Sequence, residues 1–294
     1  MINLDEIDLE IDPGKPVLIY GPTASGKSDL ALQIAQAQGG VIVNADALQV
    51  YQGWPILTAQ PSAADLVAAP HRLYGWLPYD APYSVGDWLR DVRPFLNQRP
   101  IIVGGTGLYF TALTEGLADI PPTPAAVRAQ ADATSLPDLI ADLDVDTLAA
   151  IDQQNHARVQ RAWEVQATTG RSIKQWQVAT PPPLLPLDAC TALCLMPDVD
   201  WLNTRIARRY IAMMDKGALD EARDMAPHWS PSAPSSKAIG AAEMIQLLSG
   251  KITPDSAREA IVIATRQYAK RQRTWGRSRM KRWQIVPLPN LVDR

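Results

Sequence analysis

The stretch from Gly21 to Ser28 constrains this chain more than any other. Its residues, Gly-Pro-Thr-Ala-Ser-Gly-Lys-Ser, fit the G-x-x-x-x-G-K-[ST] pattern of phosphate-binding loops. An apolar run at 16–20 precedes it, and the apolar spacing after it predicts a helix over 29–37. Strand, glycine-rich loop and helix in this order turn backbone N–H groups and a helix N-terminus toward phosphate oxygens. The loop therefore predicts a bound di- or triphosphate, without saying which molecule carries it.

All eight residues of the loop are expected to bind this di- or triphosphate. The backbone N–H groups converge on the phosphates, Lys27 reaches the terminal phosphate, and the Ser28 hydroxyl holds Mg²⁺, the one cofactor expected. The eight residues are Gly21, Pro22, Thr23, Ala24, Ser25, Gly26, Lys27 and Ser28.

Strands and helices alternate in the first part of the chain, which is typical of a parallel sheet. Short apolar runs predict further strands at 41–43, 100–103 and 189–196. Between 116 and 188 only helical patterns occur. The expected fold is therefore α/β, a P-loop NTPase-like parallel sheet flanked by helices, with a small all-helical insertion. Helices outside the insertion are expected at 87–96, 200–216, 218–225 and 238–248.

Proline-rich segments mark the domain boundaries. The pair at 121–122 ends the alternation, and the segment 181–186 leads back to the sheet. We expect a catalytic core of residues 1–120 and 186–294 and a helical insertion domain of residues 121–185. The helices of the insertion are expected at 124–132, 136–143 and 157–169.

An acidic residue and a second glycine-rich turn follow two of the predicted strands. Asp46 stands at the carboxyl end of the strand at 41–43, the edge of an open α/β sheet where ligands bind. The turn that begins at Gly104 contains Thr106 and leads into a helix that ends near Glu115.

The last predicted helix, from Pro254 past Arg277, carries a basic stripe. Arg266, Lys270, Arg273 and Arg277 are spaced i, i+4, i+7 and i+11. Residues 265–283 contain eight cations and no acid, so they carry +8, and the rest of a chain whose net charge is −3 carries −11. A neighbouring stripe consists of Tyr268, Gln272 and Trp275. Cations beside aromatic rings can follow phosphates and stack on bases, which favours RNA binding over a merely solvated surface helix.

Composition limits the class of protein to which this chain can belong. With 294 residues, 47% hydrophobic and 20% charged, the chain is globular. Cys190 and Cys194 are expected on one face of a strand as buried thiols, and the three histidines are too scattered to predict zinc. No apolar run approaches the roughly 20 residues that span a bilayer, and the N-terminus lacks a basic signal region. A cytoplasmic monomer without membrane contact is expected.

Taken together, these segments resemble the tRNA isopentenyltransferases, also called IPP transferases or tRNA dimethylallyltransferases. The resemblance covers nearly the whole chain in one order. The matching motifs are Gly-Pro-Thr-x-x-Gly-Lys-[Ser/Thr] at 21–28, Asp-x-x-x-x-Tyr at 46–51, Gly-Gly-Thr-Gly-Leu-Tyr at 104–109, Arg-x-x-Arg-Ala-x-Glu-Val at 158–165 and Thr-Arg-Gln-Tyr-Ala-Lys-Arg-Gln-x-Thr-Trp at 265–275.

The chain departs from the family pattern at a few positions. Ala47 stands where the family usually has Ser, Gln60 where it has Lys, and Gly276 where it has Phe. Ala241 and Ala242 replace a tyrosine and a basic residue, and the insertion is shorter than is typical.

The resemblance implies a reaction and its substrates. A dimethylallyl group would pass from dimethylallyl diphosphate to N6 of the adenine immediately 3′ of the anticodon in tRNA, releasing diphosphate. The partners would be this diphosphate and the tRNA anticodon stem-loop. The N6 lone pair is delocalised into the ring, so a base must take its proton, and Asp46 is the candidate. Asp46 as a Mg²⁺ ligand or as a structural acid remains open.

The resemblance also implies further site residues. Arg209 would complete the clamp on the diphosphate, and Thr106 would bond near the breaking bond unless it only caps a helix. Gln49 would read the flipped adenine unless it is buried against backbone partners. The residues expected to contact tRNA are Asp46, Ala47, Leu48, Gln49, Thr106, Arg128, Arg158, Arg161, Arg266, Lys270, Arg273 and Arg277.

Three other functions compete with this one. A P-loop small-molecule kinase would use the same loop and acid, but it leaves the basic C-terminal helix unexplained. An adenylate isopentenyltransferase alkylates a free nucleotide, and this function explains neither the basic C-terminal helix nor the insertion. A non-enzymatic RNA-binding module does not account for Asp46 or the second glycine-rich turn.

Overall fold

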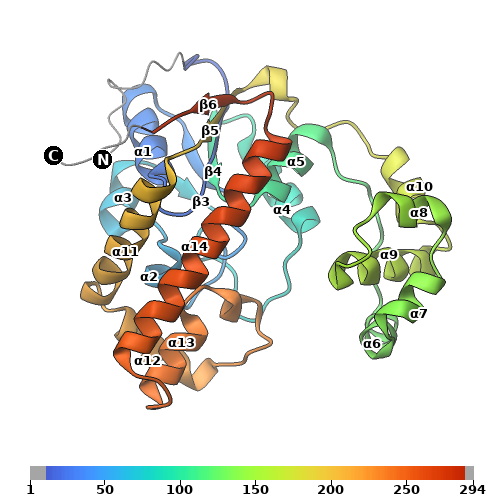
Figure 1. Ribbon diagram of the computed structural model, residues 1–294. Helices are drawn as coiled ribbons and strands as arrows, with labels where there is room; N and C mark the ends of the chain where they lie inside the picture. The colour runs from blue at the N-terminus through green and yellow to red at the C-terminus, as the bar shows by residue number, and fades with distance from the viewer. Residues whose placement is uncertain (1–10, 289–294) are drawn as a thin grey trace. The chain divides into compact units, whose positions relative to one another are not determined.

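The computed structural model describes residues 11–288, which form two compact units (Figure 1). The first, here called the sheet unit, consists of the described residues up to Thr114 and from Leu185 on. The second, the helical unit, is Glu115–Leu184. The chain therefore divides after residues 114 and 184, whereas the sequence pattern placed the boundaries after 120 and 185.

A six-stranded, all-parallel sheet forms the centre of the sheet unit, in the order β3-β2-β4-β1-β5-β6. This confirms the expected fold class. The two strands that the sequence did not predict, β3 and β6, have two and three residues and are too short to show a period. The strands are β1 (Val17–Tyr20), β2 (Val41–Asn44), β3 (His71–Arg72), β4 (Pro100–Gly104), β5 (Thr191–Leu195) and β6 (Gln284–Val286).

Both faces of this sheet are buried, because its central strands are buried at every position and apolar at all but Asn44, the last residue of β2. On one face, Leu30 and Ile34 of α1 (Lys27–Gln38) pack against alternate residues of β1, β4 and β5. On the other face, Tyr20 meets Phe110 of α5 (Gly107–Glu115) edge to face. The long helix α14 (Pro254–Arg279), red in Figure 1, crosses this second face. A Cβ on its Gly276 would lie 3.1 Å from the Tyr20 ring, which explains the absence of a large side chain there.

The other helices of the sheet unit largely match the predictions. The segment 47–70 contains two short helices that the sequence did not predict. The second begins at a capping box in which Ser62 and Asp65 each accept the other's backbone N–H. The remaining helices are α2 (Pro55–Thr58), α3 (Ala63–Ala68), α4 (Val85–Val92), α11 (Val199–Asp215), α12 (Ala218–Met225) and α13 (Ala241–Leu248).

The helical unit has its own core, in which Leu139, Val159 and Trp163 are buried. Its longest helix ends at Gly170, which has a φ of 66° in the left-handed region. Two of its helices, α8 and α10, were not predicted, because six residues show less than two turns of apolar spacing. The helices are α6 (Ala125–Ala133), α7 (Leu136–Ala141), α8 (Val145–Ala150), α9 (His156–Thr169) and α10 (Ile173–Val178).

The two cysteines differ from the expected pair of buried thiols. Cys194 is buried in β5, but Cys190 is half-buried, because it precedes the strand and follows a short 3₁₀ turn. Both are free, and burial raises the pKa of Cys190 to about 11 and that of Cys194 to about 12. Across residues 11–288 no cluster of three or more His, Cys, Asp or Glu side chains could hold a metal. Nor does any helix in that range have the length and apolar character needed to cross a bilayer.

Candidate active site

The phosphate-binding loop connects β1 to α1 at the carboxyl edge of the sheet. Gly26 is the N-cap of α1 and has a φ of 88°, a left-handed conformation that favours glycine. Lys27 is the first helical residue, and its ammonium donates to the carbonyl oxygen of Pro22 at 3.3 Å. Of the eight predicted loop residues, three are buried, namely Gly21, Pro22 and Ser25. The other five, Thr23, Ala24, Gly26, Lys27 and Ser28, line a cavity.

This cavity has a volume of about 800 Å³ and lies wholly within the sheet unit. The phosphate-binding loop, α2, the segment 58–65 and α11 form its walls, and Asp46 and Tyr74 reach it from the sheet edge. Its lining contains three carboxylates and five cations. The cations are Lys27, Arg205, Arg208, Arg209 and Lys216. An excess of positive charge in a partly enclosed site favours an anionic ligand.

The cations nearest the loop are held in a desolvated state. Burial lowers the pKa of Lys27 to about 8, although the Asp46 carboxylate acts in the opposite direction and Arg209 adds to the lowering. Burial also lowers the pKa of Arg209, again against the effect of Asp46. The Arg209 guanidinium is anchored by a 3.1 Å hydrogen bond to the carbonyl oxygen of Leu57. Lys27, Arg209 and Asp46 therefore form one electrostatic group on the cavity wall.

Asp46 is fixed by its own neighbours. Its Oδ1 accepts the N–H of Leu48 at 2.9 Å, and its backbone N–H donates to Oδ1 of Asn44 at 2.8 Å. Asn44 is completely buried and donates from Nδ2 to two backbone carbonyls. The carboxylate also raises the pKa of the buried Tyr74 hydroxyl, after burial itself. This arrangement orients the carboxylate and leaves it on the cavity surface.

Thr106 holds the chain on either side of Asp46. Its Oγ1 accepts the N–H of Ala47 at 2.9 Å, and its own N–H donates to the carbonyl oxygen of Ala45 at 3.2 Å. A hydrogen bond also links its hydroxyl to that of Tyr268. Thr106 does not line the cavity. Its contacts therefore support the placement of Asp46.

Gln49 lines the cavity but is held by the backbone. Its Nε2 donates to the carbonyl oxygens of Thr58 at 2.8 Å and Ala59 at 2.9 Å. These partners fit the alternative in which Gln49 is a structural residue. Ala47 and Leu48 are half-buried beside it and do not line the cavity.

Several cavity residues were not expected from the sequence. Arg205 donates from Nε to the carbonyl oxygen of Ala24 at 2.9 Å, and its guanidinium lies 4.7 Å from the Trp201 ring centroid. With Arg208, Arg209 and Lys216 it lines one face of α11. Their spacing of i, i+3, i+4 and i+11 is helical and would have identified this face. Tyr74 gave no such signal, because it lies in an irregular segment.

The four cations of the predicted stripe, here called the α14 ridge, are accessible. Arg266, Lys270 and Arg277 are exposed and Arg273 is half-buried. None of them makes an ion pair or a side-chain hydrogen bond with another residue in 11–288. The neighbouring stripe does not form the expected stacking surface. Gln272 is 4% exposed, and Trp275 packs so closely on Gly107 that a Cβ there would lie 2.1 Å from the indole nitrogen.

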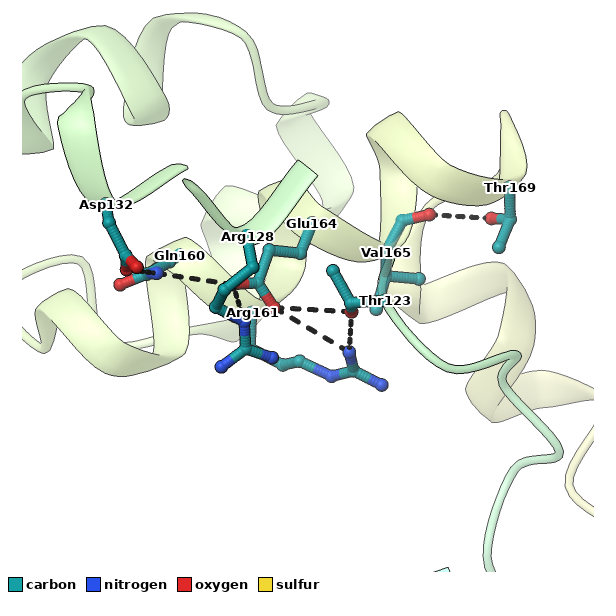
Figure 2. Close-up of polar contacts among 8 residues, drawn as sticks. All are labelled: Thr123, Arg128, Asp132, Gln160, Arg161, Glu164, Val165 and Thr169. Atoms are coloured by element: carbon teal, nitrogen blue, oxygen red, sulfur yellow. Dashed lines mark hydrogen bonds and ion pairs between the residues drawn. The ribbon is translucent and has the colours of Figure 1, made fainter. Parts of the chain in front are cut away.

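Two of the three insertion arginines share one buried carboxylate (Figure 2). Arg128 on α6 lies 3.0 Å from Glu164 on α9, and Arg161 lies 3.8 Å from it. The Glu164 side chain is 2% exposed, whereas those of Arg128 and Arg161 are 55% and 40% exposed. Thr123 accepts a 2.6 Å hydrogen bond from Arg161. Arg158 is exposed on the same helix, and the ion pairs of Glu164 within residues 11–288 are those with Arg128 and Arg161.

A parallel sheet flanked by helices, with a glycine-rich loop between β1 and α1, defines a protein with a P-loop-like α/β fold. Sequence profiles give the family. The profile described as IPP transferase matches residues 49–279, and one described as isopentenyl transferase matches residues 15–74. The chain belongs to the IPP transferase family.

Curated relatives resemble the chain over its full length. The tRNA dimethylallyltransferase of Jannaschia sp. (strain CCS1) is 58% identical over 292 residues, which are 98% of this chain and 100% of that protein. The tRNA dimethylallyltransferase of Ruegeria sp. (strain TM1040) is 59% identical over 288 residues, 97% of this chain and 99% of that protein.

Solved structures share the fold. The tRNA isopentenylpyrophosphate transferase of Bacillus halodurans is 30% identical with a TM-score of 0.66, covering 93% of this chain and 89% of that one. A eukaryotic dimethylallyltransferase acting on tRNA is 24% identical with a TM-score of 0.81, covering 94% of this chain and 74% of that one. At 24% identity the second likeness supports the fold alone.

Proposed function

We propose that this chain transfers a dimethylallyl group from dimethylallyl diphosphate to N6 of the adenine immediately 3′ of the anticodon in tRNA, releasing diphosphate. The observation that carries this proposal is the shared wall of the cavity, where Lys27, Arg209 and Asp46 lie within electrostatic reach of one another. Cations for a leaving diphosphate and a base for the acceptor thus occupy one site. Relatives 58% and 59% identical are named tRNA dimethylallyltransferases.

The cations of the cavity stabilise the leaving group. As the bond between the allylic carbon and the diphosphate oxygen breaks, its electron pair goes to that oxygen, and negative charge grows on the diphosphate. Lys27 and Arg209 already lie at this wall, so they stabilise the charge without reorganisation.

Asp46 acts on the acceptor, the adenine N6, as a base. The N6 nitrogen forms the new bond to the allylic carbon and loses one proton, which the Asp46 carboxylate accepts. Within tRNA the adenine must leave its stack before its N6 can enter this cavity. The α14 ridge and the insertion arginines supply cations for the RNA backbone.

The residues present also fit a magnesium ion. The Ser28 hydroxyl and the Asp46 carboxylate line the same cavity, and Mg²⁺ is commonly bound by one or two protein oxygens together with substrate phosphates. Ser28 would hold the ion, with Asp46 as a second ligand if it does not serve as the base. When bound, Mg²⁺ neutralises charge on the diphosphate.

One assay tests this function against its competitors. The protein is incubated with labelled dimethylallyl diphosphate and, separately, tRNA, AMP or ATP. Label in tRNA, located at the adenine 3′ of the anticodon, is expected. Label in AMP or ATP would indicate an adenylate isopentenyltransferase, and phosphate transfer from ATP would indicate a kinase. A tRNA whose target adenine is replaced by guanine is the matched negative control.

We also propose that the protein acts in the cytoplasm, where tRNA is modified, and as a monomer. Light scattering at the protein concentration of the assay measures the mass of the protein in solution. A dimer at that concentration would contradict the proposed monomer.

A further inference from the structure

Gln272 joins α14 to both glycine-rich loops of the site. Its Oε1 accepts the N–H of Thr23 in the phosphate-binding loop at 2.8 Å. Its Nε2 donates to the carbonyl oxygen of Gly105 in the second turn at 3.0 Å. Its own carbonyl oxygen accepts the Tyr20 hydroxyl at 2.6 Å. Hydrogen bonds thus fix both the side chain and the backbone of a residue that is 4% exposed.

The second turn approaches this side chain so closely that a side chain at position 105 would displace the Gln272 amide from its hydrogen bonds. A Cβ built on Gly105 would lie 2.0 Å from Nε2 of Gln272, well inside van der Waals contact. The glycine and the glutamine therefore depend on each other. This gives a physical reason for a glycine at 105 that phosphate binding does not require.

The second turn in turn positions the candidate base. Thr106 bonds to the backbone of both Ala45 and Ala47, the two neighbours of Asp46. Thr23 belongs to the cavity wall beside Lys27. Hydrogen bonds, joined by the peptide bond between Gly105 and Thr106, therefore connect the phosphate-binding loop through Gln272 to the segment that carries Asp46.

We propose that Gln272 is a positioning residue that sets the placement of the diphosphate relative to the Asp46 carboxylate. The inference rests on the proposed function, which assigns those two partners. An amide suits this position because one end must accept and the other must donate. A carboxylate cannot donate unless it is protonated, and a thioether such as that of Met can do neither well.

The test is Gln272→Glu, assayed at several pH values with both substrates saturating. At pH 8 the second carboxylate oxygen would face the Gly105 carbonyl oxygen, so the two loops are pushed apart. We expect kcat to fall on the order of 10- to 100-fold, as for a misplaced reacting group. Toward pH 5.5 the carboxyl takes up a proton and can donate again, so activity relative to the control should recover. KM for dimethylallyl diphosphate should change less than kcat, because Lys27 and the remaining loop N–H groups stay.

Gln267→Glu is the matched control. It adds the same charge to the same helix at an exposed position, and we expect kcat within twofold of the unaltered protein at every pH. Gln272→Met is the second variant, because it keeps the length of the side chain without either strong hydrogen bond. Its kcat should be low at every pH, without the recovery seen for Gln272→Glu.

Thermal unfolding of each variant at each pH gives the folded fraction, to which kcat is normalised. If Gln272→Glu is unfolded at pH 8, its activity is measured at pH 6, where the protonated carboxyl should restore folding and turnover together. Normalised kcat within twofold of the Gln267→Glu value at pH 8, or a loss in Gln272→Glu without recovery at low pH, would overturn the proposal. If the unaltered protein fails to alkylate tRNA, the proposed function fails instead.

Discussion

The cavity of the sheet unit and the arginine cluster around Glu164 in the helical unit place positive charge in opposite ways. In the sheet unit, Lys27 and Arg209 are desolvated, and the nearby Asp46 offsets only part of the resulting fall in their pKa. In the helical unit it is the carboxylate of Glu164 that is buried, and its arginine partners remain about half exposed.

This difference separates two kinds of anion binding. Desolvated cations interact strongly with a small anion at short range and are little affected by salt. Exposed guanidiniums and the unpaired cations of the α14 ridge act over a longer range and are screened by salt. A small diphosphate suits the first kind, and an RNA backbone suits the second.

The change with the largest expected effect removes the acid that faces the buried cations. Asp46→Asn should lower kcat by ~10²–10⁴-fold, because the amide cannot take the N6 proton. Binding of dimethylallyl diphosphate and tRNA should be nearly unchanged. The measurement is single-turnover transfer over a range of Mg²⁺ concentrations. Normal turnover with an altered Mg²⁺ requirement would show that Asp46 is a metal ligand and not the base.

A pH titration sharpens the difference between buried and exposed cations. Burial lowers the pKa of Lys27 to about 8, so its ammonium is charged below that pH and loses its proton above it. Affinity for dimethylallyl diphosphate should be constant from pH 6.5 to 7.5 and then fall toward tenfold per pH unit above 8. Calorimetric titration measures it. In Lys27→Met the affinity for dimethylallyl diphosphate should be low at every pH and should show no fall above pH 8. If the fall remained in this variant, a group other than Lys27 would be responsible for it.

Removing two cations of the α14 ridge tests whether exposed cations bind the RNA backbone. Lys270→Ala with Arg273→Ala should raise the KM for tRNA several-fold and leave kcat at saturating tRNA unchanged. The slope of log affinity against log salt should fall by roughly 0.7–0.9 for each phosphate that the protein no longer neutralises. Lys15→Ala with Lys251→Ala removes the same charge from exposed sites elsewhere.

Two other results would contradict the assignment of the ridge. An equal change of slope in the ridge variant and in this control would mean that only net charge matters. Weaker binding of dimethylallyl diphosphate with an unchanged salt slope for tRNA would instead place the ridge at the diphosphate.

The smallest expected effect concerns the Glu164 cluster. Arg128→Ala leaves a buried carboxylate with one guanidinium fewer, so it should lower the free energy of unfolding by about 1 kcal/mol, given the half-exposed arginine. Arg158→Ala removes an exposed arginine outside the cluster and should leave stability unchanged while weakening tRNA binding. Denaturant unfolding and tRNA titration measure the two effects.

A second substitution checks the cause of the destabilisation. Glu164→Gln in the Arg128→Ala background removes the buried charge that has lost one of its two arginine partners, so it should recover part of the stability. Equal stability of the Arg128→Ala and Arg158→Ala proteins would show that the buried carboxylate does not depend on Arg128.

The sequence by itself determined the elements whose signals are local. The strand, loop and helix around Gly26 and Lys27 lie within a few positions of one another, so their spacing reports their structure directly. The same holds for α14, where the i, i+4 spacing of Lys270 and its neighbours defined one face. Asp46 at a strand end was also readable, because parallel strands present their carboxyl ends at one edge.

Only the tertiary structure decided which polar residues face inward. Gln272 lies in a stripe that reads as exposed, yet it bonds to Thr23, 249 positions earlier in the chain. Arg205 reaches the cavity because α11 packs beside the phosphate-binding loop, and its hydrogen-bond partner Ala24 is 181 positions away in the chain. A helix's periodicity shows which residues share a face. What that face contacts is decided by the distant parts of the chain that fold against it.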